Sequence, residues 1–189
     1  TTVQSVPPPF PIVAGERIDL AVSPKDGGVV IAVRGFDYPT EDQRRQAAQN
    51  GRVRKPFENA LLMVDPGTRA IKVILASVDA EVAFAAPAVS PDGAQVAFVA
   101  GRANEDGFVP AALATAPMRE GGSQNTQNVV RGEAFEPSYT PDGQEILFVQ
   151  RVDGTRGVKR YDRESGRIES VTKAGDFAYP RLSPQSAGK

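Results

Sequence analysis

The sequence predicts an all-β fold, a β-propeller whose blades each have four antiparallel strands, with about three blades and the start of a fourth. Three observations lead to this prediction. A tight-turn motif recurs along the chain, an apolar run follows each turn, and more polar strands complete each unit. The chain is therefore expected to form a partial ring.

The recurring motif is a Ser-Pro or Thr-Pro pair followed by Asp-Gly or a close variant. Proline sets the φ angle of the first corner, while aspartate and glycine tolerate the left-handed conformation that closes the turn. The prolines of the four copies are 67, 50 and 43 residues apart, and the predicted structural turn residues are Pro24, Asp26, Gly27, Pro91, Asp92, Gly93, Pro141, Asp142, Gly143 and Pro184. These aspartates recur once per blade, a blade-width apart, so we expect them to shape turns and not to form a calcium site.

The run after each turn is apolar on both of its alternating faces, as in residues 29–33, 95–100 and 145–150. A strand of this kind is buried on both sides. Parallel α/β sheets also bury both faces, but they need a crossover helix of about a dozen residues, and the spacers here show no helical period. Stacked antiparallel sheets remain.

Two further strands follow in the same unit. Residues 61–64 and 71–75 flank one turn, residues 158–161 and 167–172 flank another, and apolar and charged side chains alternate along them. Blades pack face to face around an axis and expose their rims. Buried inner strands and more polar outer strands are therefore what a blade requires.

These spacings divide the chain into units. They are an extended, proline-rich lead-in at 1–17, blade one at about 18–80 with an insertion at 37–58, blade two at about 81–133, blade three at about 134–175, and the start of blade four at 176–189. The insertion carries five basic residues that are candidate contacts for a partner: Arg44, Arg45, Arg52, Arg54 and Lys55. A solvated loop would have the same composition, so both interpretations stay open.

The composition excludes several functions. With 22 basic and 23 acidic side chains the net charge is −1, which disfavours a nucleic-acid partner. The chain has no cysteine and no histidine, so it cannot form disulfides, thiolate nucleophiles or Ser-His pairs, and it lacks the usual zinc ligands. No segment reaches the ~20 apolar residues that span a bilayer. We therefore expect no catalytic residues, no cofactor, no metal site and no membrane span.

Residues 135–172, FEPSYTPDGQEILFVQRVDGTRGVKRYDRESGRIESVT, resemble the TolB-like group of WD-repeat-related propellers. Blades of that family carry a Ser-Pro-Asp-Gly turn, an apolar strand and a later Asp-x-x-(Ser/Thr)-Gly turn. Blade two matches at 84–102 but has APMREGGSQ, residues 116–124, in place of the second turn, and blade one has an extra residue in its first turn. The resemblance covers nearly all residues after about Ile18. It implies a propeller fold, which occurs in periplasmic binding scaffolds and in the gating propellers of prolyl-oligopeptidase-like enzymes.

Two functions fit these observations. The first is a non-catalytic binding or scaffold module, periplasmic or secreted, that presents a face or funnel to a protein or peptide partner. The alternative is the N-terminal gating propeller of a prolyl-oligopeptidase-like serine hydrolase whose catalytic domain lies outside this chain. Since about 4–8 blades close a ring, we expect the remaining blades to come from a missing segment, another chain or a second copy.

Overall fold

The computed structural model describes residues 19–36, 58–77, 81–104, 107–119 and 122–173, together with Gly175 and Pro180. Three predicted segments lie outside these residues: the lead-in at 1–17, the insertion at 37–57, and the start of blade four at 176–189 except Pro180. So do Arg44, Arg45, Arg52, Arg54, Lys55 and Pro184. The described part is all-β apart from one short 3₁₀ helix, η1 (Gly122–Asn125). None of its residues belongs to a helix with the length and apolar character needed to cross a membrane.

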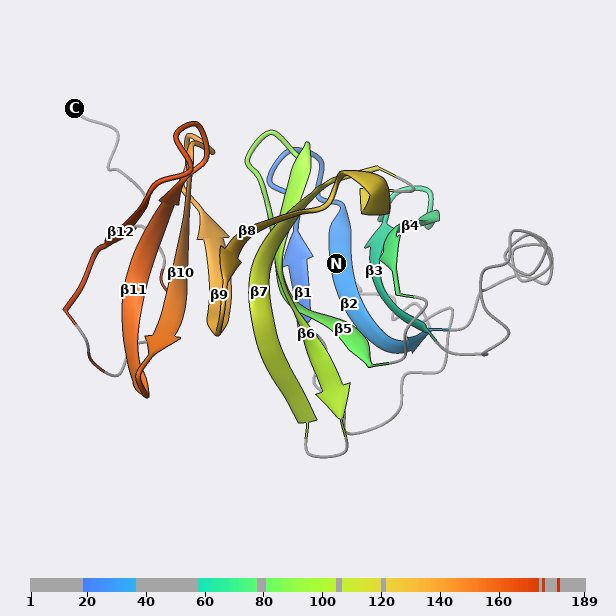
Figure 1. Ribbon diagram of the computed structural model, residues 1–189. Helices are drawn as coiled ribbons and strands as arrows, with labels where there is room; N and C mark the ends of the chain where they lie inside the picture. Colours follow the sequence, from blue (N-terminus) through green and yellow to red (C-terminus); the bar gives the residue numbers. More distant parts are fainter. Residues whose placement is uncertain are drawn as a thin grey trace, which may run out of the picture.

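The strands form three four-stranded antiparallel sheets, which stand side by side as three blades (Figure 1). Blade one has β1 (Asp19–Val22), β2 (Val29–Phe36), β3 (Glu58–Val64) and β4 (Ile71–Ala76). Blade two has β5 (Val82–Val89), β6 (Gln95–Asn104), β7 (Gly107–Pro117) and β8 (Gln127–Arg131). Blade three has β9 (Ala134–Tyr139), β10 (Glu145–Val152), β11 (Thr155–Asp162) and β12 (Ile168–Ser170). The predicted fold class, a partial β-propeller of about three blades, is confirmed.

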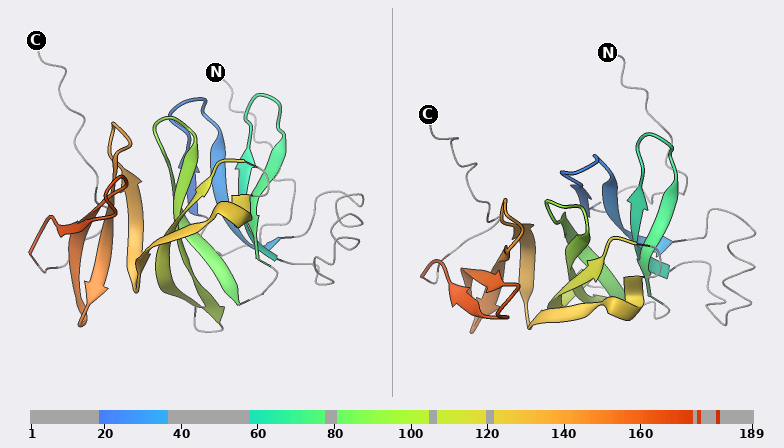
Figure 2. Two further views of the ribbon diagram at one scale, coloured as in Figure 1. Left: turned by 45° about the horizontal axis from the view of Figure 1, so that its top comes forward. Right: turned by 90° about the horizontal axis from the view of Figure 1, so that it is seen from above.

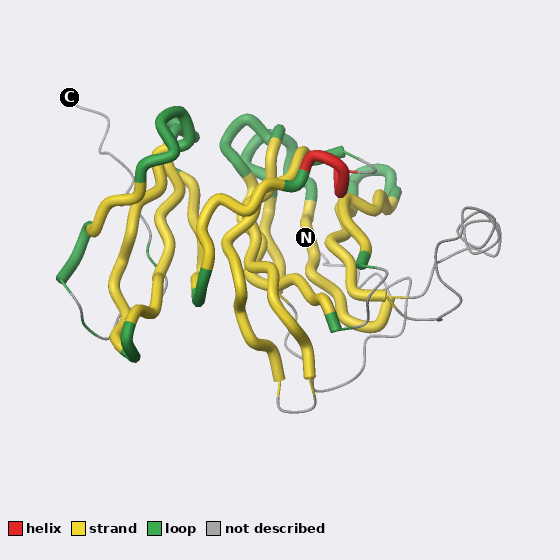
Figure 3. Tube along the Cα trace, in the orientation of Figure 1, coloured by secondary structure: helices red, strands yellow, loops and turns green. Residues whose placement is uncertain are grey.

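Each sheet is a meander in which the spatial order of the strands follows the chain. Seen from above, the three sheets follow one another as layers (Figure 2), and strands account for nearly all of the regular structure (Figure 3). The inner strand β5 packs against β1, β2 and β3 of blade one, and β9 packs against β5, β6 and β7 of blade two. The inner strands of blades two and three thus join each of them to the blade before.

Glu58, the last residue of the predicted insertion at 37–58, belongs to β3 and pairs with Phe36 at the end of β2. Residues 37–57 lie outside the described residues, so the other bounds of the insertion stay a prediction.

The first hairpin turn of blade three shows how the turn motif works. Gly143 has a φ of 72° and donates its N–H to the Thr140 carbonyl at 2.8 Å. Asp142 Oδ1 accepts hydrogen bonds from the Thr140 hydroxyl at 2.5 Å and from the Gln144 N–H at 3.0 Å. The aspartate therefore ties together the two sides of the turn, and glycine takes the left-handed position.

The corresponding turns of the other blades vary this pattern. In blade two, Asp92 Oδ1 accepts from the Ser90 hydroxyl at 2.5 Å and from the Ala94 N–H at 3.0 Å. In blade one the turn has an extra residue, and the Gly27 N–H donates to the Ser23 carbonyl, four residues back, at 3.0 Å. The extra residue lengthens the turn but keeps a glycine at its left-handed position, where φ is 75°.

One apolar core lies between blades one and two. Phe98 of β6 is fully buried there with Val30, Leu61 and Ile74 of blade one. The Phe84 ring meets the Phe98 ring edge to face, with centroids 5.5 Å apart and an interplanar angle of 87°. This geometry is the one that aromatic quadrupoles favour.

A second core lies between blades two and three. Phe148 and Ile146 of β10 are fully buried against Ala97, Leu113 and Val130 of blade two. On β10 the side chains of the opposite face, Leu147 and Val149, are buried as well. Both faces of β6 and β10 are thus buried, as their sequences predict, whereas Ile31 and Val33 of β2 are only partly buried.

The face of β1 that points away from blade two is open. Ala21 packs toward the core between blades one and two, so the neighbouring Leu20 and Val22 point to the opposite face. Both are 56% exposed. Three blades are fewer than the 4–8 or so that close a ring, so the described part is a partial propeller.

Candidate functional site

The predicted structural turn residues that the structure describes lie at one end of the blades, at the top in Figure 1. The β3–β4 and β11–β12 turns lie at the same end, which we call the turn end. The basic residues of the insertion, Arg44, Arg45, Arg52, Arg54 and Lys55, lie outside the described residues. Their contact with a partner stays a prediction.

The turn aspartates are occupied by their own turns. The Thr140 hydroxyl and the Gln144 N–H lower the pKa of Asp142. The Ser90 hydroxyl and the Ala94 N–H do the same for Asp92. In the described ranges no group of three acidic side chains is placed to hold a metal ion. These carboxylates therefore act as turn-closing acceptors.

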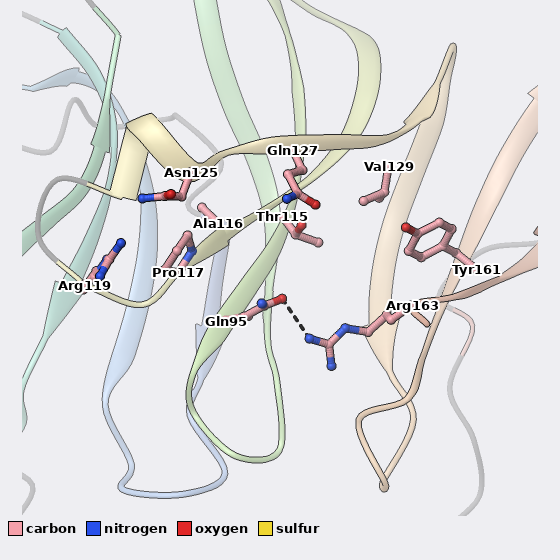
Figure 4. A pocket seen from close by; sticks show the side chains of 10 residues that line it. All are labelled: Gln95, Thr115, Ala116, Pro117, Arg119, Asn125, Gln127, Val129, Tyr161 and Arg163. Carbon is pink, nitrogen blue, oxygen red and sulfur yellow. Dashed lines mark hydrogen bonds between the residues drawn. The ribbon is translucent and has the colours of Figure 1, made fainter. Parts of the chain in front are cut away.

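A pocket of about 280 Å³ opens at the turn end between blades two and three (Figure 4). Small-molecule sites commonly have about 300–1,000 Å³, so this pocket is slightly smaller than the smallest of them. Its lining is mostly polar: Gln95, Thr115, Arg119, Asn125, Gln127 and Arg163. Tyr161 forms part of the wall on blade three and points its hydroxyl toward the same space.

The blade-two side of the pocket is built where this blade departs from the repeat. Blades one and three join their last two strands by short Asp-x-x-(Ser/Thr) turns, in which Asp65 and Asp162 accept backbone N–H groups. Blade two has a longer connection between β7 and β8, which contains Arg119 and the helix η1. Arg119 and Asn125 of this connection are both exposed and reach the pocket.

Arg163 is the central side chain on the blade-three side. Its guanidinium donates one hydrogen bond to the Gly143 carbonyl within blade three and one to Gln95 Oε1 of blade two at 2.9 Å. It also lies over the Tyr139 ring, 5.4 Å from the centroid. Arg163 therefore joins the two blades and is held on three sides.

Tyr139 supports Arg163 as a ring and not as an acid. Burial raises the pKa of the Tyr139 phenol, and its hydroxyl is buried with no hydrogen-bond partner among the described residues. The phenol therefore stays neutral, and the face of its ring attracts the guanidinium through a cation–π contact.

The pocket carries two positive charges with no carboxylate bound to them among the described residues. Neither Arg119 nor Arg163 forms an ion pair with a carboxylate in the described part of the chain. Asp92 is an acidic group that interacts electrostatically with Arg163. The Ser90 hydroxyl lowers the pKa of Asp92 most, and Arg163 lowers it further. Asp92 Oδ1 is bonded within its own turn, and Asp92 does not line the pocket, so the lining itself is polar and positively charged.

Sequence reasoning did not identify these residues. Arg163 lies in the Asp-x-x-(Ser/Thr)-Gly turn of blade three, which the sequence indicates only as a connection between strands, and its partner Gln95 is 68 residues away. The available signal was the segment 116–124, where blade two lacks the second turn of the repeat. That segment contains Arg119, so the departure from the repeat marks one wall of the pocket.

The geometry defines a partial β-propeller module, and comparisons with known proteins agree. TolB from Acinetobacter baumannii is similar over 84% of this chain and 33% of its own, with 21% identity and a TM-score of 0.57. Oligogalacturonate lyase from Vibrio parahaemolyticus is similar over 83% and 41%, with 16% identity and a TM-score of 0.55. The β-propeller domain of the Trilobed protease from Pyrococcus furiosus is similar over 82% and 42%, with 17% identity and a TM-score of 0.51.

The fold is thus that of a TolB-like β-propeller. At these identities the likeness concerns the fold alone, and the chain spans between 33% and 42% of the length of these three proteins. No family model and no curated protein matches the sequence. Any more specific role has to be argued from the residues of the pocket.

Proposed function

We propose that this chain is a non-catalytic propeller module that presents its turn end to a protein or peptide partner. The observation that carries the proposal is the pocket between blades two and three, where Arg119 and Arg163 lie without an ion-pair partner among the described residues. A positively charged pocket at the open end of two blades offers an anchoring point to a partner that lies across both.

The size of the pocket supports a partner surface over a small substrate. A volume of about 280 Å³ is enough for one or two side chains but is below the usual size of sites that enclose a whole small molecule. Interfaces gain much of their binding energy from a few anchoring side chains held in such pockets. The rest of the partner would lie over the turn end.

The residue types of this chain also favour binding over catalysis. The sequence has no histidine or cysteine, so a serine or thiol nucleophile activated by a neighbouring imidazole cannot be built from it. The carboxylates of Asp92 and Asp142 have lowered pKa values because of their turn hydrogen bonds. A general acid at neutral pH needs a raised pKa, which is the opposite shift.

The experiment has two parts. Purified chain is applied to an array of short peptides of graded net charge, and is separately assayed for hydrolysis of peptide and ester substrates. We expect saturable binding to a subset of peptides and no turnover. Absence of binding above background across the array, or turnover that survives stringent purification, would contradict the proposal.

A second function remains open, the gating propeller of a serine hydrolase whose catalytic domain lies on another part of a longer protein. Its support is the likeness in fold to the propeller domain of the Trilobed protease. Sequencing the gene beyond Lys189 separates the two functions, because a hydrolase would continue into a Gly-x-Ser-x-Gly segment. We also propose a periplasmic or secreted location from the resemblance to TolB-like propellers, which cell fractionation would test.

A further inference from the structure

We propose that the pocket between blades two and three binds a carboxylate group, with the guanidinium of Arg163 as its hydrogen-bonding partner and the guanidinium of Arg119, at the other end of the pocket, as a second positive charge that attracts it. The carboxylate would come from an acidic side chain or the C-terminus of the polypeptide partner. This inference rests on the proposed function and specifies the chemistry that the partner must carry.

Four described arginines have carboxylate partners: Arg102 with Glu81, Arg151 with Glu133, Arg160 with Glu145 and Glu169, and Arg167 with Glu169. Arg163 has none in the same part of the chain, although it is half-buried. An exposed arginine such as Arg69 keeps its full hydration, whereas a half-buried one loses part of it and gains more from an added anion.

Arg163 is fixed by the Gly143 carbonyl, by Gln95 Oε1 and by the Tyr139 ring. All three contacts are with neutral groups, and Asp92 acts on Arg163 through electrostatic attraction without forming an ion pair with it. The guanidinium is thus held in place with no carboxylate bound to it among the described residues. The two hydrogen bonds use two of the five N–H donors that a guanidinium carries. An incoming carboxylate therefore meets a donor group whose side-chain entropy has already been lost.

The other polar residues that line the pocket suit a short acidic segment of polypeptide. Figure 4 shows Arg163 and Arg119 at opposite ends of the pocket, with the side chains of Gln127 and Asn125 along one edge. A carboxylate accepts from a guanidinium in a bidentate manner. The two side-chain amides offer both donors and acceptors, which suit the peptide groups next to an acidic residue. The pocket volume of about 280 Å³ has room for one such side chain and part of its backbone.

The experiment is an NMR titration of the isotope-labelled chain, which follows the arginine Nε–H signals and the side-chain amide signals of glutamine and asparagine. The probe is a short acetylated and amidated Gly-Ser peptide with a single glutamate, and its control has glutamine in that position. A third titration uses glutarate, a free dicarboxylate. We expect saturable shifts at Arg163 and Gln127 with the glutamate peptide and none with the glutamine peptide.

Two variants test the assignment without removing Arg163, whose loss would also disturb the contact between the blades. Gln95→Glu places a carboxylate of the same shape beside the Arg163 guanidinium, so the chain should stay folded while its binding of the glutamate peptide is lost. Arg119→Gln removes the second positive charge, which acts from the other end of the pocket, and should weaken binding about 2- to 5-fold. Arg69→Gln, at the same end but on blade one, is the matched control and should leave the affinity unchanged.

Each outcome decides between the proposals. If Arg69→Gln weakens binding as much as Arg119→Gln, the attraction is a general surface effect and the inference is wrong. If the glutamate and glutamine peptides bind equally, or if Gln95→Glu has no effect, the partner does not use a carboxylate in this pocket, while the proposed peptide-binding function stands. If glutarate binds as tightly as the peptide and with the same dependence on Arg119, the carboxylate site is supported and a polypeptide partner is not.

Discussion

The contact between blades one and two makes a quantitative prediction for Phe98→Ala. Phe98 is fully buried in the middle of β6, within the core that joins the two blades, and its ring meets the Phe84 ring edge to face at 5.5 Å. Truncation removes the whole ring and leaves a cavity between two sheets. Since both sheets are held by their own ladders, they cannot close the gap without moving as units.

The expected loss is about 3–5 kcal/mol of unfolding free energy, the range for a buried phenylalanine changed to alanine. For a domain of this size each kcal/mol lowers the melting temperature by about 2–4 °C, so the variant should melt about 6–20 °C below the parent chain. Part of the loss belongs to the ring pair. A double-mutant cycle with Phe84→Ala should show a coupling of about 0.5–1.5 kcal/mol.

The assay is thermal and urea unfolding followed by circular dichroism, with Val152→Ala as the control. Val152 is also an apolar residue on a strand, but it is 51% exposed, so its truncation should change stability by less than about 0.5 kcal/mol. A Phe98→Ala variant that melts within about 2 °C of the parent chain would refute the reasoning, because it would mean that the core between these blades does not support the fold.

Three further predictions follow from other parts of the structure. Gly101→Ala should destabilise the β6–β7 hairpin by about 1–3 kcal/mol, because the added Cβ would lie 2.3 Å from the Val109 carbonyl oxygen. Gly157→Ala is the control and should be tolerated, because its Cβ would have no heavy atom within 4 Å. Equal melting temperatures of the two variants would contradict this prediction. The Thr140 hydroxyl lowers the pKa of Asp142, and the Ser90 hydroxyl lowers that of Asp92. The stabilisation from these two ionised carboxylates should therefore be complete above the pKa of an aspartate in the unfolded chain, about 3.9. It should be lost as the pH falls through the lower pKa values of the folded chain. Acid unfolding of Asp142→Asn should therefore depend less steeply on pH than that of the parent chain, and identical profiles would count against it. Because the face of β1 is open at Leu20 and Val22, light scattering on this chain alone should show association, and a compact, non-associating monomer with cooperative melting would overturn the expectation of missing blades.

The repeat could be predicted from the sequence because local chemistry determines it. A Thr-Pro-Asp-Gly turn needs only residues that lie within five positions of each other, as the bonds of Thr140 to Asp142 and Glu145 show. The apolar runs likewise report their burial directly, and Phe98 and Phe148 are fully buried. Turn chemistry and strand periodicity therefore give the same answer at each repeat.

The bulges of the inner strands could not be predicted in this way. Ala86 and Glu136, each directly before a proline, have φ angles of 47° and 52°, and the β5–β6 and β9–β10 ladders shift register close to them. A residue before proline prefers an extended conformation, and a non-glycine residue avoids positive φ. Tertiary contacts offset this cost, because Asp19 Oδ2 of blade one accepts the Ala86 N–H at 3.0 Å. No local rule reveals a bond that spans 67 residues.

The candidate site was hidden for a related reason. Arg163 lies in the second turn of blade three, at a position where the repeat motif specifies no residue type. Only the packing of blade three against blade two brings it to Gln95. The opposite wall comes from the one blade that lacks this turn, through the connection that contains Arg119. A regular turn is held by hydrogen bonds among its own residues. The longer β7–β8 connection that replaces it in blade two instead changes which side chains lie between blades two and three. Features that distinguish one propeller from another are therefore to be sought where a blade breaks its own repeat, and in this chain that place is residues 116–124.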